Sequence, residues 1–347
     1  MKFSRRIVAL VAAGILAAST GMWAQAQEKP PTVEEFYRGK QVRVISTGGA
    51  MTDYDMYARM ITTLMTKYMP GNPTFVVQSM TGGGGIVGTN YLYNVAAQDG
   101  SVLGMVARNM PQVALVGDSN VKFDPAKFQW LGSPEISHGI CAVVTGAKVQ
   151  KFEDLLQHEL LIGGTGAGST GSQTATFLNR LLGTKFRLVE GYKTVPDVSL
   201  AMIKGEVEAV CQSLAGLKGG NLQGWIEAGK LKVLFNVEEK RIPGLDAPSI
   251  FEFAKTDEQR QLLRVFSAAG EIGRPMLVPP NVPADRVQAL REAFNKAVND
   301  PEFLEQTRKL NLDITLVKGE EIQKIVERTM STPKDLVAKF EKMISAK

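Results

Sequence analysis

Three segments of the chain combine glycines with hydroxyl or amide side chains, at 47–55, 81–85 and 164–172. Glycine lets the backbone approach a ligand closely and adopt positive φ angles. Each segment precedes a stretch of helical character, and the start of a helix presents free N–H groups and a positive dipole to an anion. One such loop is equally well explained as a tight turn with a helix cap. Three of them favour recognition of an anion such as a carboxylate, without a dedicated arginine.

Catalytic chemistry has weaker support. Gly166, Gly168 and Gly171 fit the G-x-G-x-x-G dinucleotide pattern, and Glu190 ends the next predicted strand. This motif supports a nicotinamide-dependent oxidoreductase as a remote alternative. The chain has no evident His–Asp pair or lysine base for hydride transfer, no Lys-Ser or Lys-Thr after the glycines, and no Gly-x-Ser-x-Gly elbow. We therefore expect a binding protein without cofactor or catalytic residues, not an enzyme.

Cysteine and histidine are scarce. Cys141 and Cys211 each border a short apolar run, and they could pair in an oxidising compartment. We favour two buried thiols, because sequence alone does not give their separation. His138 and His158 have no carboxylate or cysteine at ligand spacing, so we predict no metal site.

The glycine segments lie within a repeated pattern of strand, loop and helix. Such a repeat is typical of a parallel sheet with helices on its faces. A helix ending near Gly183 and another over 284–298 are also predicted, as is a capped helix carrying Met56, Arg59 and Leu64. The predicted strands are 41–46, 75–77, 101–107, 140–144, 160–164, 186–189, 208–212, 231–235 and 265–268.

The N-terminus has the form of a secretory leader. Lys2, Arg5 and Arg6 precede an uncharged apolar run over 7–18, and Ala24-Gln25-Ala26 supplies a small-x-small cleavage pattern. We predict a signal peptide over 1–26, cleavage before Gln27 and a periplasmic product; a retained anchor is the alternative, although the run is short for a bilayer span.

The charge of the mature chain argues against nucleic acid as a partner. Loss of the leader lowers the 40 basic residues to 37 against 35 acidic ones, a net charge of +2 without a basic block. The remaining length, about 320 residues, exceeds one ordinary core and favours two domains. No linker separates two halves, which suggests lobes joined by more than one crossing.

The glycine-rich segment 79–92 is followed by the turn Gln98-Asp99-Gly100. This arrangement resembles the glycine segment and the following turn of the Bug family, the receptors of tripartite tricarboxylate transporters. The other matches, in the same order as in the family, are Tyr54-Asp55-x-Tyr57-Ala58-Arg59, 123–128, 164–169, Gly191-Tyr192, 201–207, Gly273-Arg274-Pro275 and 279–286. The likeness covers essentially the whole mature chain.

The resemblance implies an α/β type II periplasmic binding protein with a ligand cleft between two lobes. Lobe one is expected over 27–128 and 238–347, and lobe two over 129–237. Carried over from the family, the ligand-binding residues of lobe one are Gly48, Gly49, Thr52, Asp55, Thr81, Gly83 and Gly84, and those of lobe two are Thr165, Ser169, Thr170, Tyr192 and Gln212. Met51, Ser79 and Thr81 depart from the family pattern in these loops.

The resemblance also implies a function. The expected protein is a monomer that captures a small carboxylate, a di- or tricarboxylate in particular, and passes it to membrane permease subunits. An alternative is a periplasmic subunit that reports the ligand to a membrane histidine kinase. Neighbouring genes for a permease or for a kinase would separate the two.

Overall fold

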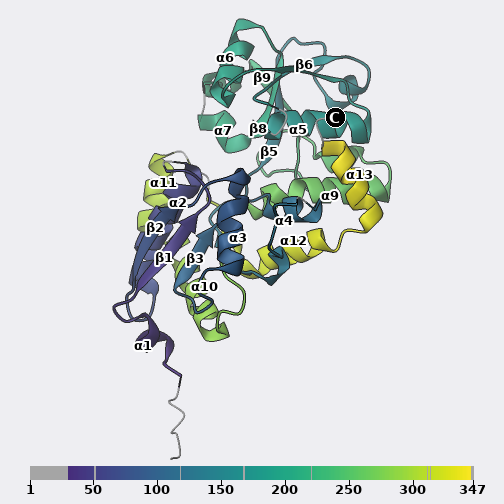
Figure 1. The fold of residues 1–347 in the computed structure, drawn as a ribbon. Helices are drawn as coiled ribbons and strands as arrows, with labels where there is room; N and C mark the ends of the chain where they lie inside the picture. Colours follow the sequence, from purple (N-terminus) through teal and green to yellow (C-terminus); the bar gives the residue numbers. More distant parts are fainter. Residues whose placement is uncertain are drawn as a thin grey trace, which may run out of the picture.

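The computed structural model describes residues 30–50, 52–117, 119–166, 169–219, 221–310, 312 and 314–344. The predicted signal peptide lies outside them. Two sheets divide the molecule into an upper and a lower lobe (Figure 1). Among the described residues, no helix combines the length and apolar character needed to cross a membrane.

Lobe one is built on a six-stranded sheet in which β1 lies between two parallel neighbours, β2 and β3. β10 joins the far side of β3 in the antiparallel direction. Buried side chains pack on both faces of this sheet, as is usual for strands covered by helices on both sides. In sheet order, the strands are β11 (Val317–Lys318), β4 (Gln129–Ser133), β10 (Met276–Val278), β3 (Val102–Met105), β1 (Gln41–Ser46) and β2 (Thr74–Ser79).

Lobe two repeats this plan with five strands. β6 lies between its parallel neighbours β7 and β8, and β5 joins the far side of β8 in the antiparallel direction. Apolar clusters again cover both faces. In sheet order, the strands are β7 (Phe186–Glu190), β6 (Leu160–Gly164), β8 (Ala209–Ser213), β5 (Gly139–Val144) and β9 (Leu231–Asn236).

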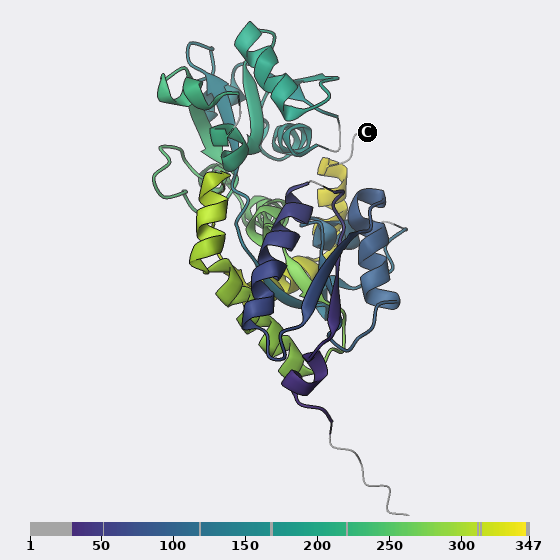
Figure 2. The same ribbon diagram turned by 90° about the vertical axis from the view of Figure 1, so that its left-hand side faces the viewer.

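Helices cover the two sheets and connect them, and Figure 2 shows α10 and α11 running along one side of lobe one. Short 3₁₀ turns occur at η1 (Gly83–Gly85), η2 (Pro125–Lys127), η3 (Phe152–Leu156) and η4 (Ile250–Phe253). The α-helices are α1 (Val33–Tyr37), α2 (Asp53–Tyr68), α3 (Ile86–Asn94), α4 (Met110–Leu115), α5 (Thr170–Leu182), α6 (Val195–Lys204), α7 (Leu214–Gly219), α8 (Gln223–Glu227), α9 (Asp257–Ile272), α10 (Ala284–Val298), α11 (Pro301–Lys309), α12 (Gly319–Met330) and α13 (Lys334–Ile344).

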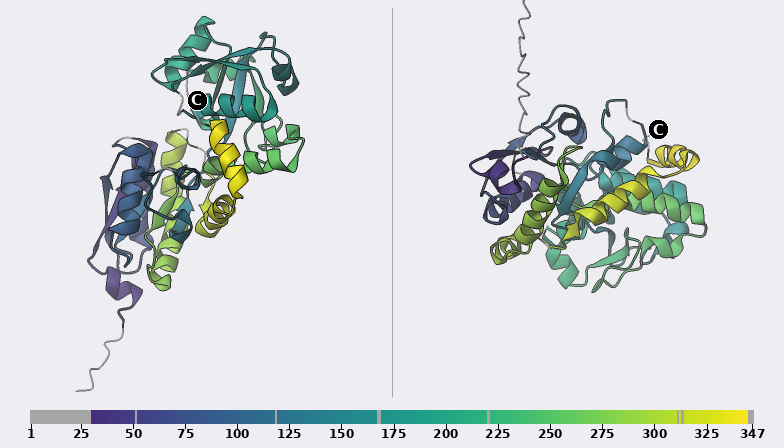
Figure 3. Two further views of the ribbon diagram at one scale, coloured as in Figure 1. Left: turned by 45° about the vertical axis from the view of Figure 1, so that its right-hand side comes forward. Right: turned by 90° about the horizontal axis from the view of Figure 1, so that it is seen from below.

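The expected lobe boundaries differ from this division at two places. β4, expected at the start of lobe two, pairs with β10 in the sheet of lobe one, so the first crossing follows Ser133. At the C-terminal end, Leu336 and Phe340 of α13 pack into the core of lobe two, and α9 contributes Leu263 to that core and Ile272 to a core of lobe one. Figure 3 shows α13 reaching back to the second lobe.

The predicted strand over 265–268 is wrong, because these residues lie within α9. A capping box at Thr256 and Gln259 starts this helix nine residues upstream of Val265. Val265 and Ala268 are three residues apart and share its buried side, and such a short apolar run cannot be distinguished from a strand by its pattern alone. The other predicted strands are all present, with ends shifted by a few residues at most.

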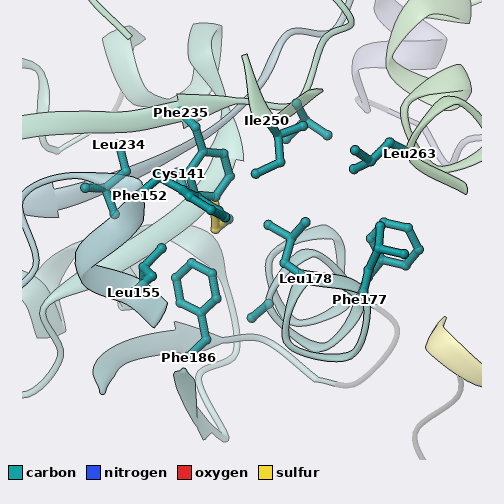
Figure 4. Packing of buried hydrophobic residues seen from close by; sticks show 14 of the residues in the cluster. Cys141, Phe152, Leu155, Phe177, Leu178, Phe186, Leu234, Phe235, Ile250 and Leu263 are labelled. Atoms are coloured by element: carbon teal, nitrogen blue, oxygen red, sulfur yellow. A yellow bond between two sulfur atoms is a disulfide. The ribbon is translucent and has the colours of Figure 1, made fainter. Parts of the chain in front are cut away.

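Cys141 and Cys211 form a disulfide, so the preference for two free thiols was wrong. The two residues lie directly opposite each other on the antiparallel strands β5 and β8, with their Cα atoms 4.0 Å apart. Figure 4 shows Cys141 among Phe152, Phe235 and Phe186 on one face of the sheet. The bond therefore joins two neighbouring interior strands of lobe two within its core.

Candidate functional site

Two adjoining cavities lie between the lobes. The first, here called the hinge cavity, has a volume of about 320 Å³ and is bordered by β5, α9 and the segment after β9. The second, the loop cavity, has a volume of about 490 Å³ and is bordered by the glycine loop after β6 and the start of α6. Six residues line both cavities: Arg108, Ser137, Thr170, Gln212, Ser213 and Arg274.

Lobe two brings four of its five predicted residues to the cavities. Thr165, Ser169 and Thr170 line the loop cavity together with Gln212 at the end of β8. Ser169 is the N-cap of α5, where its hydroxyl oxygen accepts a hydrogen bond from the Ser172 N–H at 3.3 Å. The first turn of α5, with its positive dipole, thus lies at the cavity.

Gly171 allows this helix start to pack against the sheet. A Cβ atom at Gly171 would lie 2.9 Å from the backbone oxygen of Cys211. Only glycine therefore permits this approach of α5 to β8 without a shift of one of them. The glycine loop positions the hydroxyl groups, and the end of β8 positions Gln212 beside them.

Tyr192 is the exception in lobe two, because it lines neither cavity. Its hydroxyl donates a hydrogen bond to the Glu206 carboxylate at 3.4 Å. Burial raises the pKa of the Tyr192 hydroxyl, and the negative charge of Glu206 adds to this effect.

The predicted residues of lobe one line neither cavity. These are Gly48, Gly49, Thr52, Asp55, Thr81, Gly83 and Gly84. Thr52 is the N-cap of α2, and Gly84 adopts a φ of 64° that favours glycine. The buried Asp55 carboxylate accepts hydrogen bonds from Arg59 Nε at 2.9 Å and Nη2 at 3.1 Å. These contacts stabilise the loops themselves, and the Asp55 charge is already paired.

Arg108 is the cavity residue that sequence reasoning missed in lobe one. It follows β3, and its backbone N–H donates to the Tyr54 hydroxyl at 3.2 Å. Among the described residues, its guanidinium has no hydrogen-bond or ion-pair partner within 4 Å. Burial, followed by the nearby Arg274 charge, lowers the pKa of Arg108 below its ordinary value. A usable signal existed, because Arg108 stands at the carboxyl end of a predicted parallel strand, where ligands of open α/β sheets bind.

Arg274 also lines both cavities, but its charge is paired. Its guanidinium forms ion pairs with Asp53, at 2.6 Å, and with Glu135. It joins the start of α2 to the crossing segment after β4, and its Nε is buried without a hydrogen bond among the described residues. Arg274 therefore holds the hinge side of lobe one in place, and Arg108 remains the unpaired cation of the site.

The site has no evident place for a metal ion. In the part of the chain that the structure describes, no group of three or more His, Cys, Asp or Glu side chains could hold one. The available chemistry is that of hydrogen-bond donors around one guanidinium, which suits the binding of a carboxylate.

Comparison with known proteins agrees with this geometry. Residues 58–341 match the model of the tripartite tricarboxylate transporter family receptor. A protein of Cupriavidus necator, "UPF0065 protein in gbd 5'region", is 22% identical over 338 residues, covering 94% of this chain and 95% of that protein.

Solved structures show the same fold. A TctC solute-binding protein from Polaromonas superimposes with a TM-score of 0.69 at 20% identity, covering 87% of this chain and 99% of that one. MatC of Rhodopseudomonas palustris, solved with bound malate, has a TM-score of 0.56 at 17% identity, covering 88% and 99% of the two chains. These likenesses confirm the predicted two-lobed periplasmic-binding-protein fold.

The members of this family are periplasmic solute-binding receptors and not enzymes, so the nicotinamide alternative is set aside. The family match extends over most of the chain and includes every strand of the two sheets except β1. The chain belongs to the tripartite tricarboxylate transporter receptor family.

Proposed function

We propose that the protein captures a small carboxylate between its lobes in the periplasm and delivers it to the membrane subunits of a tripartite tricarboxylate transporter. The unpaired Arg108 guanidinium in the cavity carries this proposal. A partly buried cation without a counter-ion is unfavourable in the empty site, and an anionic ligand supplies the missing charge.

The surrounding groups complete the proposed site. Hydroxyl groups of Ser169 and Thr170 and the amide of Gln212 lie on the side of lobe two, opposite Arg108 of lobe one. A carboxylate held between them would join the lobes, and exclusion of water would strengthen each of its hydrogen bonds. Because malate is bound in a structure with the same fold, a carboxylate of this size is a reasonable first probe.

A thermal-shift screen of the mature protein against mono-, di- and tricarboxylates tests the ligand class. A ligand at 100 times its Kd should raise the free energy of unfolding by about 2.7 kcal/mol. Sugars and nicotinamide nucleotides serve as controls and should leave the melting temperature unchanged. A panel in which no carboxylate stabilises the protein, but a control compound does, would overturn the proposed function.

The periplasmic location has a separate test. The intact mass of the protein from a periplasmic extract should correspond to a chain that begins at Gln27, as the Ala24-Gln25-Ala26 pattern predicts. Recovery of the protein from membranes with Met1 attached would contradict the predicted cleavage.

A further inference from the structure

A histidine and a glutamate lie beside each other at the hinge cavity, on the segments that border strands β5 and β9. His138 immediately precedes β5, and Glu238 is the second residue after β9. These two strands pair in the antiparallel direction. The N–H of Val237 donates to the carbonyl of Gly139 at 2.8 Å, and this bond continues the pairing and sets His138 opposite Glu238.

The Glu238 carboxylate lies at the cavity wall with little to compensate its charge. Its side chain is only 12% exposed, and the residue lines the hinge cavity. A Cβ atom at Gly270 would lie 3.6 Å from Glu238 Oε1, so α9 packs close to that oxygen. In the described part of the chain, no group donates a hydrogen bond to this carboxylate. Such a charge in the wall opposes the binding of an anion, because like charges at short range repel.

His138 is the group that can supply the compensating charge. Its Nδ1 lies 3.5 Å from Glu238 Oε1 and is buried without a hydrogen bond among the described residues. His138 lines neither the hinge cavity nor the loop cavity, so it can act on a ligand only through Glu238. Histidine side chains change charge between about pH 5 and pH 8, and both ring nitrogens of the imidazolium are donors. Protonation would therefore place a charged donor next to Glu238.

The other charged groups around this pair are paired with each other, exposed or beyond ion-pair distance. Arg108 of lobe one is more than 4 Å from Glu238, although the Glu238 charge acts on it. Lys218 on α7 and Lys240 after β9 are exposed. The ion pairs around the cavity are Arg274 with Asp53 and Glu135, Arg264 with Glu239, and Arg328 with Glu271. Protonation of His138 is thus the change that alters the net charge facing Arg108.

We propose that His138 controls the affinity of the site through Glu238, so that a carboxylate ligand binds more tightly as the pH falls. This inference rests on the proposed function, because it concerns the regulation of the same site. At alkaline pH the neutral imidazole leaves the Glu238 charge opposed to the ligand. At acid pH the imidazolium pairs with Glu238, and the field of Arg108 then acts on the ligand alone. Protonation of His138 and binding of the anion therefore favour each other by the same factor.

Calorimetric titration of the mature protein at about pH 6 and about pH 8 tests this role of His138. The probe is malate, or the carboxylate that stabilises the protein most in the thermal-shift screen if malate does not bind. It should bind about 3- to 10-fold more tightly at the lower pH. Repeating the titration near the midpoint of this range, in buffers of different ionisation enthalpy, should show that the protein takes up protons on binding.

Two variants separate the partners. Glu238→Gln removes the opposing charge and should bind the probe tightly at both pH values. His138→Gln removes the titrating group and should bind at both with about the affinity of the parent protein at the higher pH. If His138→Gln does not fold, Glu238→Gln alone decides the question.

Matched controls exist for both changes. Glu239→Gln alters the neighbouring acid, which pairs with Arg264 and lines neither the hinge cavity nor the loop cavity. His158→Gln alters the other histidine of the chain, which is exposed. Both controls should keep the pH dependence of the parent protein. Ionisation of the probe itself is common to all these proteins and cancels in their affinity ratios.

The outcomes distinguish this inference from the proposed function. Equal affinity of the parent protein at both pH values, or a pH dependence that survives Glu238→Gln, would overturn the role of His138 and leave carboxylate capture standing. Weaker binding by Glu238→Gln at the higher pH would do the same, because Glu238 would then assist the ligand. If no carboxylate of the screen binds at either pH, carboxylate capture itself fails, and this inference fails with it.

Discussion

The two lobes have the same strand plan and the same glycine-rich loops, yet their loops have different places in the molecule. In each sheet one strand, β1 or β6, has parallel neighbours on both sides, and an antiparallel strand joins the far side of one of these neighbours. In each lobe a loop with glycines ends at a hydroxyl N-cap, Thr52 before α2 and Ser169 before α5. The loop of lobe two lines the loop cavity with its hydroxyl groups, whereas the corresponding segment of lobe one contributes Tyr54 to the hinge cavity, and lobe one adds Arg108 from the loop after β3.

This difference shows that a glycine–hydroxyl segment predicts a capped helix start but does not by itself predict contact with a ligand. Such a segment lets a strand turn directly into a capped helix, which any α/β unit requires. Whether the loop also contacts a ligand depends on which strand ends face the other lobe, and this is decided by the crossings between lobes. Variants in matched pairs, one in each lobe, therefore test whether the loops of the two lobes differ in ligand contact.

The largest expected effect concerns the disulfide, because both cysteines of the chain belong to lobe two. The double variant Cys141→Ala/Cys211→Ala opens a loop of 70 residues. It should lower the free energy of unfolding by about 4 kcal/mol in the chain-entropy view. Lobe two should then unfold at a lower urea concentration than lobe one.

Tryptophan fluorescence can follow the lobes separately. Trp130 lies on β4 of lobe one and Trp225 on α8 of lobe two. In the Cys141→Ala/Cys211→Ala variant, the further change Trp225→Phe leaves Trp130 as the reporter of lobe one. The change Trp130→Phe instead leaves Trp225 as the reporter of lobe two. Equal midpoints in urea for the variant and the disulfide-bonded protein would contradict the expected stabilisation.

The next effect is on binding and concerns the unpaired cation. Arg108→Gln should weaken carboxylate binding by about 100-fold, the equivalent of about 2.7 kcal/mol, because it removes the charge from a partly buried site. The ligand-free protein should be as stable as before or slightly more stable, since burial of this charge is unfavourable. Arg187→Gln is the control, on an exposed arginine paired with Glu159. Unchanged affinity in Arg108→Gln would remove the main support for the proposed site.

Two glycines in the first turn of a helix, Gly171 of α5 in lobe two and Gly88 of α3 in lobe one, test the loops by steric change. A Cβ at Gly171 would lie 2.9 Å from Cys211 O, and one at Gly88 in α3 would lie 2.8 Å from Met80 O. Each change to alanine should cost about 1–3 kcal/mol of stability through overpacking. Only Gly171→Ala should also weaken ligand binding, because α5 begins at the loop cavity whereas no residue of α3 lines either cavity. Thermal melts and titrations of both variants would show the difference; loss of affinity in Gly88→Ala would indicate that lobe one's loops also reach the ligand.

The smallest effect comes from the two N-caps. Thr52→Ala and Ser169→Ala should each cost about 1 kcal/mol of stability through the lost cap. Ser169→Ala should in addition reduce affinity by up to about 10-fold for one hydrogen bond, and Thr52→Ala should not. Equal affinities in the two variants and the parent protein would show that Ser169 only caps its helix.

Much of the fold was predictable because it depends on local patterns. The strand at 41–46 is apolar and bordered by a glycine loop, and α5 ends at Gly183, which adopts the left-handed conformation that ends helices. The Bug-family resemblance then indicated the arrangement of these units in two lobes. The lobe to which β4 belongs was not predictable, because pairing with β10 joins residues about 150 positions apart.

The site was predictable only in part, because its two sides come from segments that are far apart in the chain. Thr165, Ser169, Thr170 and Gln212 stand at strand ends of one lobe, and their shared place follows from the strand–loop–helix pattern. The sequence determined the secondary structure, the family and the donor-rich loop of lobe two through short-range patterns of glycine, hydroxyl and apolar residues.

Which charges remain unpaired between the lobes depends on the tertiary structure. Arg274 is neutralised by Asp53 and Glu135, whereas Arg108 has no ion-pair partner within 4 Å among the described residues. These are relations of a few ångströms between residues far apart in the chain, and they arise when three crossings bring two separately patterned sheets together. The same holds for Cys141 and Cys211, whose pairing depends on the register of β5 against β8.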